Sequence, residues 1–316
     1  MVTEFLFVGL GLVILLLAGD LLVKGAVNLA LRLGIPALIV SLTVVAFGTS
    51  APELLISIRA ILDGLPGLAM GNVVGSNTAN VLLVLGIPAI ISGLDTRKCD
   101  TKRSYMMMIG GSLVFIGLAF MGPFTWWHGL ILLSLLALVL LDQARAAHAH
   151  RRAANDAPPE DEPEGADPDM PSWKIGLYLV LGLIGLPLGA SLLVDSATAI
   201  ASAYGVSDTV IGLTLVAVGT SLPELATTVV AAWRNHAEVA IGNVIGSNLF
   251  NLLGIIGVTA LIGPIPVDAT ILRYDLWVMI AASLLLIPFI FLSLRMGRMV
   301  GFGFVGLYIV YIVSLF

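Results

Sequence analysis

The sequence predicts an all-α membrane protein in which ten transmembrane helices form two five-helix repeats of inverted topology. Three observations carry this prediction: a shortage of charge, the spacing of the apolar segments, and a pair of motifs that occurs twice. Of the 316 residues, 59% are hydrophobic and only 11% are charged, whereas soluble domains carry about 25% charged residues. A soluble enzyme or a nucleic-acid-binding protein is therefore not expected.

Ten segments are long and apolar enough to cross a bilayer, which takes about 20 helical residues. They are expected near residues 5–23, 39–62, 68–92, 104–121, 126–144, 174–203, 209–232, 239–262, 276–294 and 300–316. The first is not expected to be a cleaved signal peptide, because no positive charge precedes it in Met1–Glu4. The single cysteine, Cys99, excludes an internal disulfide and a cysteine-rich metal site.

The distribution of lysine and arginine predicts the orientation of the chain, because these residues accumulate in cytoplasmic loops. With ten spans, both termini lie on one side, whose loops hold only Arg59 and Arg273. The loops of the other side hold twelve basic residues: Arg32, Arg97, Lys98, Lys102, Arg103, Arg145, Arg151, Arg152, Lys174, Arg234, Arg295 and Arg298. This bias places both termini outside the cytoplasm.

One hydrophilic stretch, residues 145–172, separates a first repeat at 1–144 from a second at 173–316. Its acidic part contains seven carboxylates: Asp156, Glu160, Asp161, Glu162, Glu164, Asp167 and Asp169. With five prolines among them, it buries too little apolar surface to fold. We expect a flexible cytoplasmic linker. A regulatory cation site among these acids, or binding at His148 and His150, is a weaker alternative.

The two halves repeat each other at a constant distance of 171 positions. The matching pairs are VAFGTSAPELL at 45–55 with VAVGTSLPELA at 216–226, GNVVGSNTANVLLVLG at 71–86 with GNVIGSNLFNLLGIIG at 242–257, and LLVKGA at 21–26 with LLVDSA at 192–197. Five predicted spans separate each position from its counterpart, and an odd number turns the second copy upside down. Inverted repeats are typical of secondary transporters, whose substrate site lies near the middle of the membrane.

The repeated motifs place polar residues inside the second and seventh spans. These residues are Thr49, Ser50 and Glu53 in one half, and Thr220, Ser221 and Glu224 in the other. Residues three and four positions apart share a helix face, so the hydroxyls can approach the glutamate in each half. A carboxylate inside a span is costly and usually functional, and two at matching positions predict a cation site.

A proline precedes each glutamate, at Pro52 and Pro223. Proline lacks an N–H and clashes with the carbonyl four residues earlier. We therefore expect it to free carbonyls around Ala46–Gly48 and Ala217–Gly219. Free carbonyls inside a membrane need another partner, and a bound cation would provide one.

The third and eighth spans add further polar groups. The candidate ligands there are Ser76, Asn80, Ser247 and Asn251. Four other amides are expected to brace broken helix ends rather than bind an ion: Asn72, Asn77, Asn243 and Asn248. Gly71 with Gly75, and Gly242 with Gly246, form the small-xxx-small pattern that lets helices approach closely, so we expect these glycines to serve packing.

All the candidate ligands are hard oxygen donors, which suit calcium, whereas softer metals prefer thiolate or imidazole. Two ionised glutamates balance one calcium ion, and sodium ions or protons can satisfy the same oxygens. Ions that share ligands exclude each other, as exchange requires. A channel is one alternative. An intramembrane metal-dependent hydrolase is a weaker one, because no span pairs a histidine with an acid as such chemistry would need.

The motifs GTSAPE with GNVVGSNTAN, and GTSLPE with GNVIGSNLFN, resemble the two alpha repeats of the sodium/calcium exchanger family of the cation/calcium antiporter superfamily, in its prokaryotic type. The resemblance covers nearly the whole chain apart from the linker. It implies sodium-driven calcium antiport by ten helices in the cell (inner) membrane of a prokaryote, with no cofactor and no enzymatic activity. The partners it implies are calcium and sodium ions and the lipid bilayer. The ligands carried over by position are Ala46, Thr49, Ser50, Glu53, Ser76, Asn80, Ala217, Thr220, Ser221, Glu224, Ser247 and Asn251.

The sequence departs from this family at Asn251, where some members carry an aspartate. The predicted site therefore holds two carboxylates rather than three. We expect sodium as the coupling ion, with proton coupling as the alternative.

The first and sixth spans are long and poor in polar residues at mid-depth, which predicts tilted helices. The family resemblance implies that these two helices form a gate that slides across the other eight. Lys24 and Asp195 occupy equivalent repeat positions near opposite membrane faces. We expect them to lie at the interfaces rather than to form an ion pair.

Overall fold

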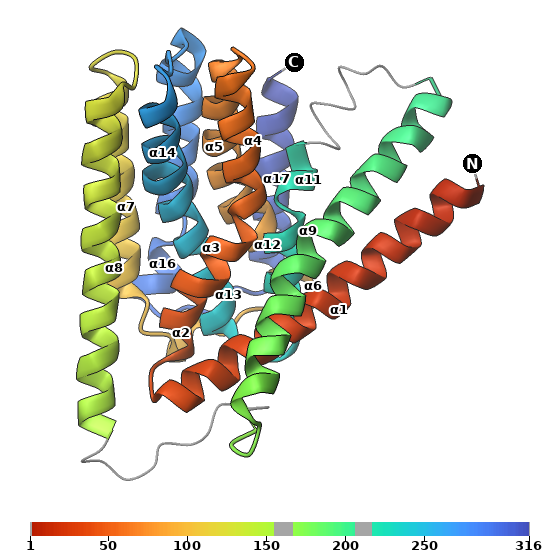
Figure 1. Cartoon of the computed structure of the whole chain (residues 1–316), viewed down its shortest axis with the longest axis vertical. Helices are drawn as coiled ribbons and strands as arrows, with labels where there is room; N and C mark the ends of the chain where they lie inside the picture. Colours follow the sequence, from red (N-terminus) through yellow and green to blue (C-terminus); the bar gives the residue numbers. More distant parts are fainter. Residues whose placement is uncertain (1, 155–166, 206–216, 316) are drawn as a thin grey trace.

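The computed structural model describes residues 2–154, 167–205 and 217–315, and the chain is almost entirely helical in these ranges. Figure 1 shows a bundle of upright helices crossed obliquely by the pair α1 and α9. The prediction of an all-α membrane protein is confirmed.

The first half contains two long helices at its ends and several short segments between them. Its elements are α1 (Val2–Leu33), α2 (Ala37–Val40), η1 (Ser41–Val45), α3 (Ala46–Thr49), α4 (Ala51–Leu62), α5 (Pro66–Ala79), η2 (Asn80–Val84), α6 (Gly86–Ile91), η3 (Thr96–Lys98), α7 (Lys102–Ala119) and α8 (Trp126–Ala154). The wider π-helical turns η1 and η2 lie inside otherwise α-helical spans. Such turns are frequent at functional sites.

The second half follows a similar order. Its described elements are α9 (Ser172–Ala203), α11 (Ala217–Thr220), α12 (Leu222–Trp233), α13 (Ala237–Leu249), η5 (Phe250–Ile255), α14 (Ile256–Ile262), η6 (Ile271–Asp275), α15 (Leu276–Leu284), α16 (Ile287–Phe291) and α17 (Arg298–Ser314). Here too, the π-helical turns η5 and η6 interrupt long spans.

Within the described residues, six helical segments are long and apolar enough to cross a membrane. They are Thr3–Leu33, Pro66–Ile91, Trp126–His150, Ser172–Ala203, Ala237–Ile262 and Ile271–Phe291. The pair Ala37–Thr49 and Ala51–Leu62 makes a seventh if it counts as one span, because it bends by 42° at its break. The count of ten stays a prediction, and its seventh span lies partly outside the described residues.

The predicted bounds of three spans are wrong. The first span extends to Leu33 rather than 23. The fifth continues as α8 to Ala154 rather than ending at 144, because its alanine-rich extension has a high helix propensity. The ninth begins at Ile271 rather than 276 and ends at Phe291 rather than 294. This last shift brings an acidic residue, Asp275, into the span.

The segment predicted as a flexible linker is ordered at both ends. Its first ten residues belong to α8. At the other end, the Asp167 backbone N–H donates to Asn28 Oδ1 at 2.8 Å, and Arg32 donates to the Met170 carbonyl at 2.7 Å. Residues 167–171 are therefore attached to the last turns of α1, while residues 155–166 lie outside the described part.

The long helices α1 and α9 pack against each other along their lengths, as Figure 1 shows. Glycine allows the close approach: a Cβ on Gly182 would lie 2.6 Å from Leu22 Cβ, and one on Gly189 would lie 3.0 Å from the Leu15 nitrogen. Their length of 32 residues each and their oblique course confirm the prediction of long, tilted spans.

Charged residues also attach α1 to its surroundings. Lys24 forms an ion pair with Asp20 at 2.9 Å, one turn earlier on the same helix. Asp20 pairs in addition with Arg234, at the end of α12. Asp195 accepts a hydrogen bond from Ser191 at 3.1 Å. Lys24 and Asp195 each have a partner on their own helix, which agrees with the expectation that they do not pair with each other.

The centre of the bundle is formed by two matching spans, Pro66–Ile91 and Ala237–Ile262. In each, 78% of the most apolar stretch is buried inside the protein. The corresponding share is 33% for α1 and 22% for α8 and α9. The exposed side chains of these outer helices are mostly apolar, such as Leu17, Leu138 and Leu188, as a lipid-facing surface requires.

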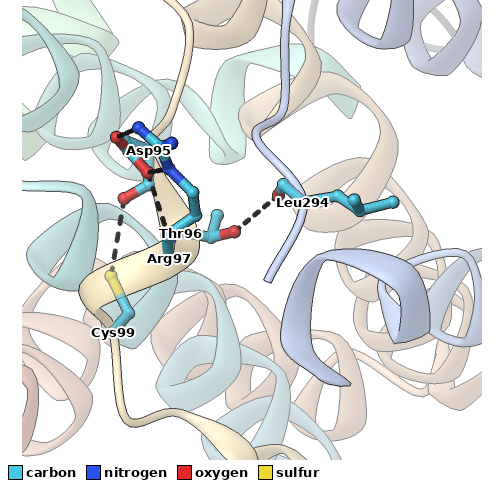
Figure 2. Close-up of polar contacts among 5 residues, drawn as sticks. All are labelled: Asp95, Thr96, Arg97, Cys99 and Leu294. Carbon is cyan, nitrogen blue, oxygen red and sulfur yellow. Dashed lines mark hydrogen bonds and ion pairs between the residues drawn. The ribbon is translucent and has the colours of Figure 1, made fainter. Parts of the chain in front are cut away.

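At one end of the bundle, the connection between α6 and α7 is tied to the connection between α16 and α17. Leu94 and Met296 exchange backbone hydrogen bonds of 2.9 and 3.0 Å. The buried Thr96 hydroxyl donates to the carbonyls of Leu294 at 2.7 Å and Phe289 at 3.0 Å. Figure 2 shows the Thr96–Leu294 contact. These bonds hold the ends of two distant helices together.

The same connection carries an exposed ion pair beside the only cysteine (Figure 2). Arg97 donates two side-chain hydrogen bonds to the Asp95 carboxylate, at 2.8 and 2.6 Å, and this holds the pKa of Asp95 at about 2. The Cys99 thiol donates to the Asp95 carbonyl at 3.9 Å. Burial, with smaller contributions from Glu238 and Asp95, raises the pKa of the thiol to about 12.

We therefore expect Cys99 to react slowly with maleimide. Only the thiolate is nucleophilic, and at pH 7.5 a pKa of about 12 leaves far less thiolate than an ordinary cysteine has. Labelling of the folded protein should be at least about 100-fold slower than that of an exposed thiol, and it should accelerate as the pH rises.

The control is Asp100→Cys in a Cys99→Ser background, because Asp100 is exposed in the same connection. Equal labelling rates for the two thiols would contradict the prediction. Wild-type protein unfolded in detergent should label at the rate of the control.

Candidate functional site

The two glutamate motifs form a pair of broken helices. The first break lies at Ser50, between α3 and α4, and the second at Ser221, between α11 and α12. Pro52 and Pro223 lie in the first turn of the helix that follows each break. In that position the missing N–H costs nothing, because the first N–H groups of a helix have no partner within the helix.

The expected release of the carbonyl is wrong for Ala46. The Ala46 carbonyl accepts a hydrogen bond from the Ser50 N–H at 3.0 Å and one from the Thr49 hydroxyl at 3.3 Å. The helix therefore keeps this carbonyl in its ladder and ends at Thr49, because Ser50 leaves the helical conformation with φ −85° and ψ 3°. Ala217 begins the corresponding short helix α11.

Glu53 and Glu224 lie in the first turns of α4 and α12 and are 1% and 0% exposed. Helix N-termini carry a partial positive charge, which favours a carboxylate there. The two glutamates are near enough to repel each other electrostatically. Among the described residues, no lysine or arginine forms an ion pair with either one. The site therefore concentrates negative charge without a cationic side chain.

Several predicted ligands, the two glutamates among them, have buried polar atoms without a hydrogen-bond partner. Ten buried side-chain nitrogen or oxygen atoms of the described residues have no hydrogen-bond partner, and seven of them belong to predicted ligands. The seven are Glu53 Oε2, Asn80 Oδ1, Ser221 Oγ, Glu224 Oε2, Ser247 Oγ, Asn251 Oδ1 and Asn251 Nδ2. A buried polar atom left unpaired costs about 1–3 kcal/mol, so a concentration of them indicates a ligand site.

The remaining predicted ligands occupy the same region. The Ser50 hydroxyl donates to Glu224 Oε1 at 3.2 Å, which links the two halves directly. Thr49 is buried and makes a 3.3 Å contact with Asn243 Oδ1 in α13. Ser76 and Thr220 line one cavity. Among the described residues, no three histidine, cysteine, aspartate or glutamate side chains are placed to hold a metal, so a cation here would need hydroxyl and amide oxygens as well.

Two of the other asparagines of the motifs, Asn72 and Asn243, brace the broken helices, as predicted. Asn72 donates to Ser57 Oγ at 3.2 Å, and in the other half Asn243 donates to Thr228 Oγ1 at 3.4 Å. These bonds attach α5 to α4 and α13 to α12.

Further amide contacts join the two central spans, Pro66–Ile91 and Ala237–Ile262, to each other. Asn77 donates to the Asn248 carbonyl at 3.2 Å, and Asn248 donates back to the Asn77 carbonyl at 3.4 Å. Asn80 donates to Asn248 Oδ1 at 3.1 Å. Because this bond uses the Asn80 nitrogen, the amide oxygen of Asn80 stays available.

Two cavities extend from this region. The larger, of about 420 Å³, runs along α5, η6 and α17 and is lined by both Ser76 and Thr220. The smaller, of about 200 Å³, lies between α9 and the two broken helices and is lined by Asp195, Pro187 and, again, Thr220. The candidate ligand Thr220 is thus reached from two directions.

The glycine pairs differ between the halves, so the packing interpretation is correct for one pair and wrong for the other. A Cβ on Gly242 would lie 3.0 Å from the Leu38 carbonyl oxygen, and one on Gly246 only 2.3 Å from that of Leu42. By contrast, a Cβ on Gly71 or Gly75 would meet nothing within 4 Å. These two glycines line the larger cavity instead.

Two acidic residues inside the spans were not predicted from the sequence. Asp20 lies within the first apolar span and pairs with Lys24 and Arg234. Asp275 lies in the ninth span, where it is 8% exposed and lines the larger cavity. A span begun at Ile271 instead of 276 would have included Asp275.

The chain matches the family model described as sodium/calcium exchanger protein over residues 3–144 and 174–316. It is 34% identical to the sodium/calcium exchanger MaX1 of Methanosarcina acetivorans, over 99% of this chain and 98% of that protein. It is also 34% identical to the inner membrane protein YrbG of Escherichia coli, over 99% and 96% of the two chains. A solved structure of the sodium-calcium exchanger NCX_Mj superimposes with a TM-score of 0.83 at 34% identity, covering 100% and 99% of the two chains.

The difference between the glycine pairs gives a matched test. We expect Gly246→Ala to destabilise the protein by about 1–3 kcal/mol, because the added methyl collides with backbone and neighbouring helices would have to move. Gly75→Ala, at the equivalent position, should leave stability unchanged or slightly raised, because alanine is the better helix former.

The measurement is the midpoint of thermal unfolding in detergent, monitored by size-exclusion chromatography or by intrinsic fluorescence. Equal destabilisation by the two substitutions would contradict the assignment of one pair to packing and the other to the cavity wall.

Proposed function

Because the chain belongs to the sodium/calcium exchanger family, we propose that it is a secondary active antiporter that exchanges sodium for calcium across the membrane by alternating access. One observation carries the proposal: Glu53 and Glu224 are buried, Ser50 on the Glu53 side donates to Glu224 at 3.2 Å, and most of the buried side-chain polar atoms without a hydrogen-bond partner belong to the predicted ligands. Two buried carboxylates that no lysine or arginine neutralises need bound cations or protons to balance their charge.

The proposed ion site combines both halves of the chain. Its ligands are Ala46, Thr49, Ser50, Glu53, Ser76, Asn80, Ala217, Thr220, Ser221, Glu224, Ser247 and Asn251. Calcium takes about six to eight oxygen ligands in flexible geometry, and this set of carboxylates, hydroxyls, amides and carbonyls offers that many. Sodium ions would use the same oxygens. Because bound sodium and bound calcium exclude each other, filling the site with one ion releases the other.

The proposed architecture is ten helices in two inverted repeats, 1–144 and 173–316. Matching bounds support it: α4 and α12 each have twelve residues, and their ends lie 171 positions apart. The reciprocal bonds of Asn77 and Asn248 also join residues 171 positions apart. Two halves that can exchange conformations allow one site to open first to one face and then to the other.

We propose that α1 and α9 together form the moving gate. They pack closely on each other and lie obliquely across the bundle (Figure 1). The ion pair of Asp20 with Arg234 connects this gate to α12, which carries Glu224. Movement of the gate would therefore be transmitted to the broken helix α12.

The proposed orientation has both termini outside the cytoplasm and residues 145–172 inside, in the cell membrane of a prokaryote. The excess of basic residues in the loops of one side supports it. In Figure 1, α1 begins and α17 ends toward the same end of the bundle, and α8 finishes toward the opposite end.

We expect Glu53→Gln and Glu224→Gln each to lower sodium-driven calcium flux at least tenfold. Each substitution keeps the shape of the side chain but removes a charge that balances half of a calcium ion. The measurement is radioactive calcium uptake into proteoliposomes loaded with sodium. The matched control is Glu238→Gln, in the first turn of α13 and outside the site, which should keep near-normal flux. Near-normal flux in either site variant would refute the site.

The coupling ion is tested by imposing one gradient at a time on wild-type proteoliposomes. We expect calcium to accumulate against its own gradient when sodium flows outward, and not when only a pH gradient is present. Accumulation that follows the pH gradient would favour the proton-coupled alternative, which the amide at Asn251 in place of a third carboxylate keeps open. Calcium movement only down its own gradient would indicate a channel.

A further inference from the structure

Asp275 is a buried carboxylate inside a membrane span but outside the repeated motifs. It ends the π-helical turn η6, within the span Ile271–Phe291, and is 8% exposed. Ionisable residues within a span are costly and usually mark an ion or substrate pathway. Among the described residues, no lysine or arginine forms an ion pair with Asp275.

Its carboxylate is held in place by α17. The Tyr311 hydroxyl donates to Asp275 Oδ1 at 3.0 Å. The Tyr311 ring stacks on that of Tyr274, with centroids 6.3 Å apart, and the Tyr274 hydroxyl contacts Ser314 Oγ at 2.8 Å. Tyr311 uses its one hydroxyl hydrogen on Oδ1, so it orients the carboxylate without neutralising it.

Asp275 also lines the wall of the larger cavity. Leu68 and Leu315, which are 55% and 42% exposed, lie where this cavity meets the surface. Ser76 and Thr220, both proposed ligands of the central site, lie on its lining as well. A second carboxylate, Asp268, is 3.7 Å from the position of a Cβ on Gly67, another lining residue. The cavity thus connects a buried acid with two proposed ligands of the central site, and the exposed Asp268 lies near its lining.

The counterpart of Asp275 in the first half is not acidic. The distance of 171 positions extends to these spans, where MIGGSL at 108–113 matches MIAASL at 279–284. The equivalent serines, Ser112 and Ser283, each donate to the carbonyl four residues earlier, at 2.8 and 3.0 Å. This register pairs Asp275 with Ser104, a buried residue that accepts a hydrogen bond from Gln143 at 3.5 Å.

We propose that Asp275, oriented by Tyr311, forms an accessory cation site in the cavity that leads to the central site, with hydrated calcium as its preferred occupant. This inference rests on the proposed function. A fixed negative charge in a cavity with low-dielectric walls raises the local concentration of cations, and of divalent ions most. Because the counterpart is a serine, only the membrane face on which Asp275 lies gains this effect. The two faces therefore differ in apparent calcium affinity although the central ligands match.

The first test measures calcium transport from each face separately, in proteoliposomes of sorted orientation. Asp275→Asn should raise the calcium KM at the face of the larger cavity at least fivefold. The rate at saturating calcium should stay within twofold, because the central ligands are unchanged, and the KM at the opposite face should not move. Asp275→Glu should restore the KM. If Asp275→Asn does not fold, Asp275→Ser, which copies Ser104, takes its place.

Two controls separate charge from structure. Asp268→Asn removes an exposed rim charge of the same kind and should raise the KM less than twofold. Tyr311→Phe removes the hydrogen bond but keeps the charge, so it should change the KM less than Asp275→Asn does. An unchanged KM in Asp275→Asn, or equal shifts at both faces, would overturn the proposal. Absence of sodium-driven flux in the wild type would instead refute the proposed function.

The second test detects the site without transport. Terbium(III) binds oxygen ligands of the kind that calcium uses, and nearby tyrosines sensitise its luminescence; Tyr308 and Tyr311 line the cavity. In full-length Glu53→Gln/Glu224→Gln protein, the central site is weakened. Terbium luminescence that persists there, is displaced by calcium, and disappears on adding Asp275→Asn would support the accessory site. Luminescence that is the same with and without Asp275 would overturn it.

Discussion

The arrangement of this protein depends on one electrostatic constraint, the burial of Glu53 and Glu224 without a positively charged side chain beside them. An isolated ionised carboxylate is costly in a low-dielectric interior, and two near each other add repulsion. Helix N-termini recover part of that cost, because both glutamates lie in first turns. The remainder must come from bound cations or from protonation of the carboxylates. The stability of the central site is therefore linked to the transported cations.

The helices around the site serve to keep these two carboxylates together. Each break lies at a serine, with proline where a missing N–H costs nothing. Asn72 and Asn243 then fix the broken segments to the neighbouring spans, and Asn77 and Asn248 join those spans to each other. Amides suit this purpose because each can donate and accept at once. The hydrogen bonds of the bracing asparagines leave the ligand oxygens of Asn80 and Asn251 unpaired.

Periodicity and repetition were sufficient to predict an all-α membrane protein, the paired buried glutamates and the bracing asparagines, because these features are encoded locally. Three features were not predictable in this way. The extent of α8 to Ala154 reflects helix propensity in a polar segment, which a search for apolar spans does not register. One of the two partners of Asp20, Arg234, is distant in sequence, so this pair is visible only in three dimensions. The different surroundings of Gly75 and Gly246 depend on which elements pack there, although their sequence contexts are alike.

That difference between equivalent glycines shows how a symmetric sequence gives an asymmetric protein. Gly246 touches the Leu42 backbone, while Gly75 lines a cavity, so the two halves of one motif occupy different environments at the same time. An alternating-access carrier requires this, because identical surroundings would open the site to both faces or to neither. Under the proposed mechanism this difference is conformational and reversible, because the two halves exchange conformations. The difference between Asp275 and Ser104 is one of amino-acid sequence, so it persists through the whole transport cycle. Because the ligands match between the halves, the same oxygens can bind ions that enter from either face. Because only one approach to them contains an acid, the proposed accessory site raises the apparent calcium affinity on one face alone.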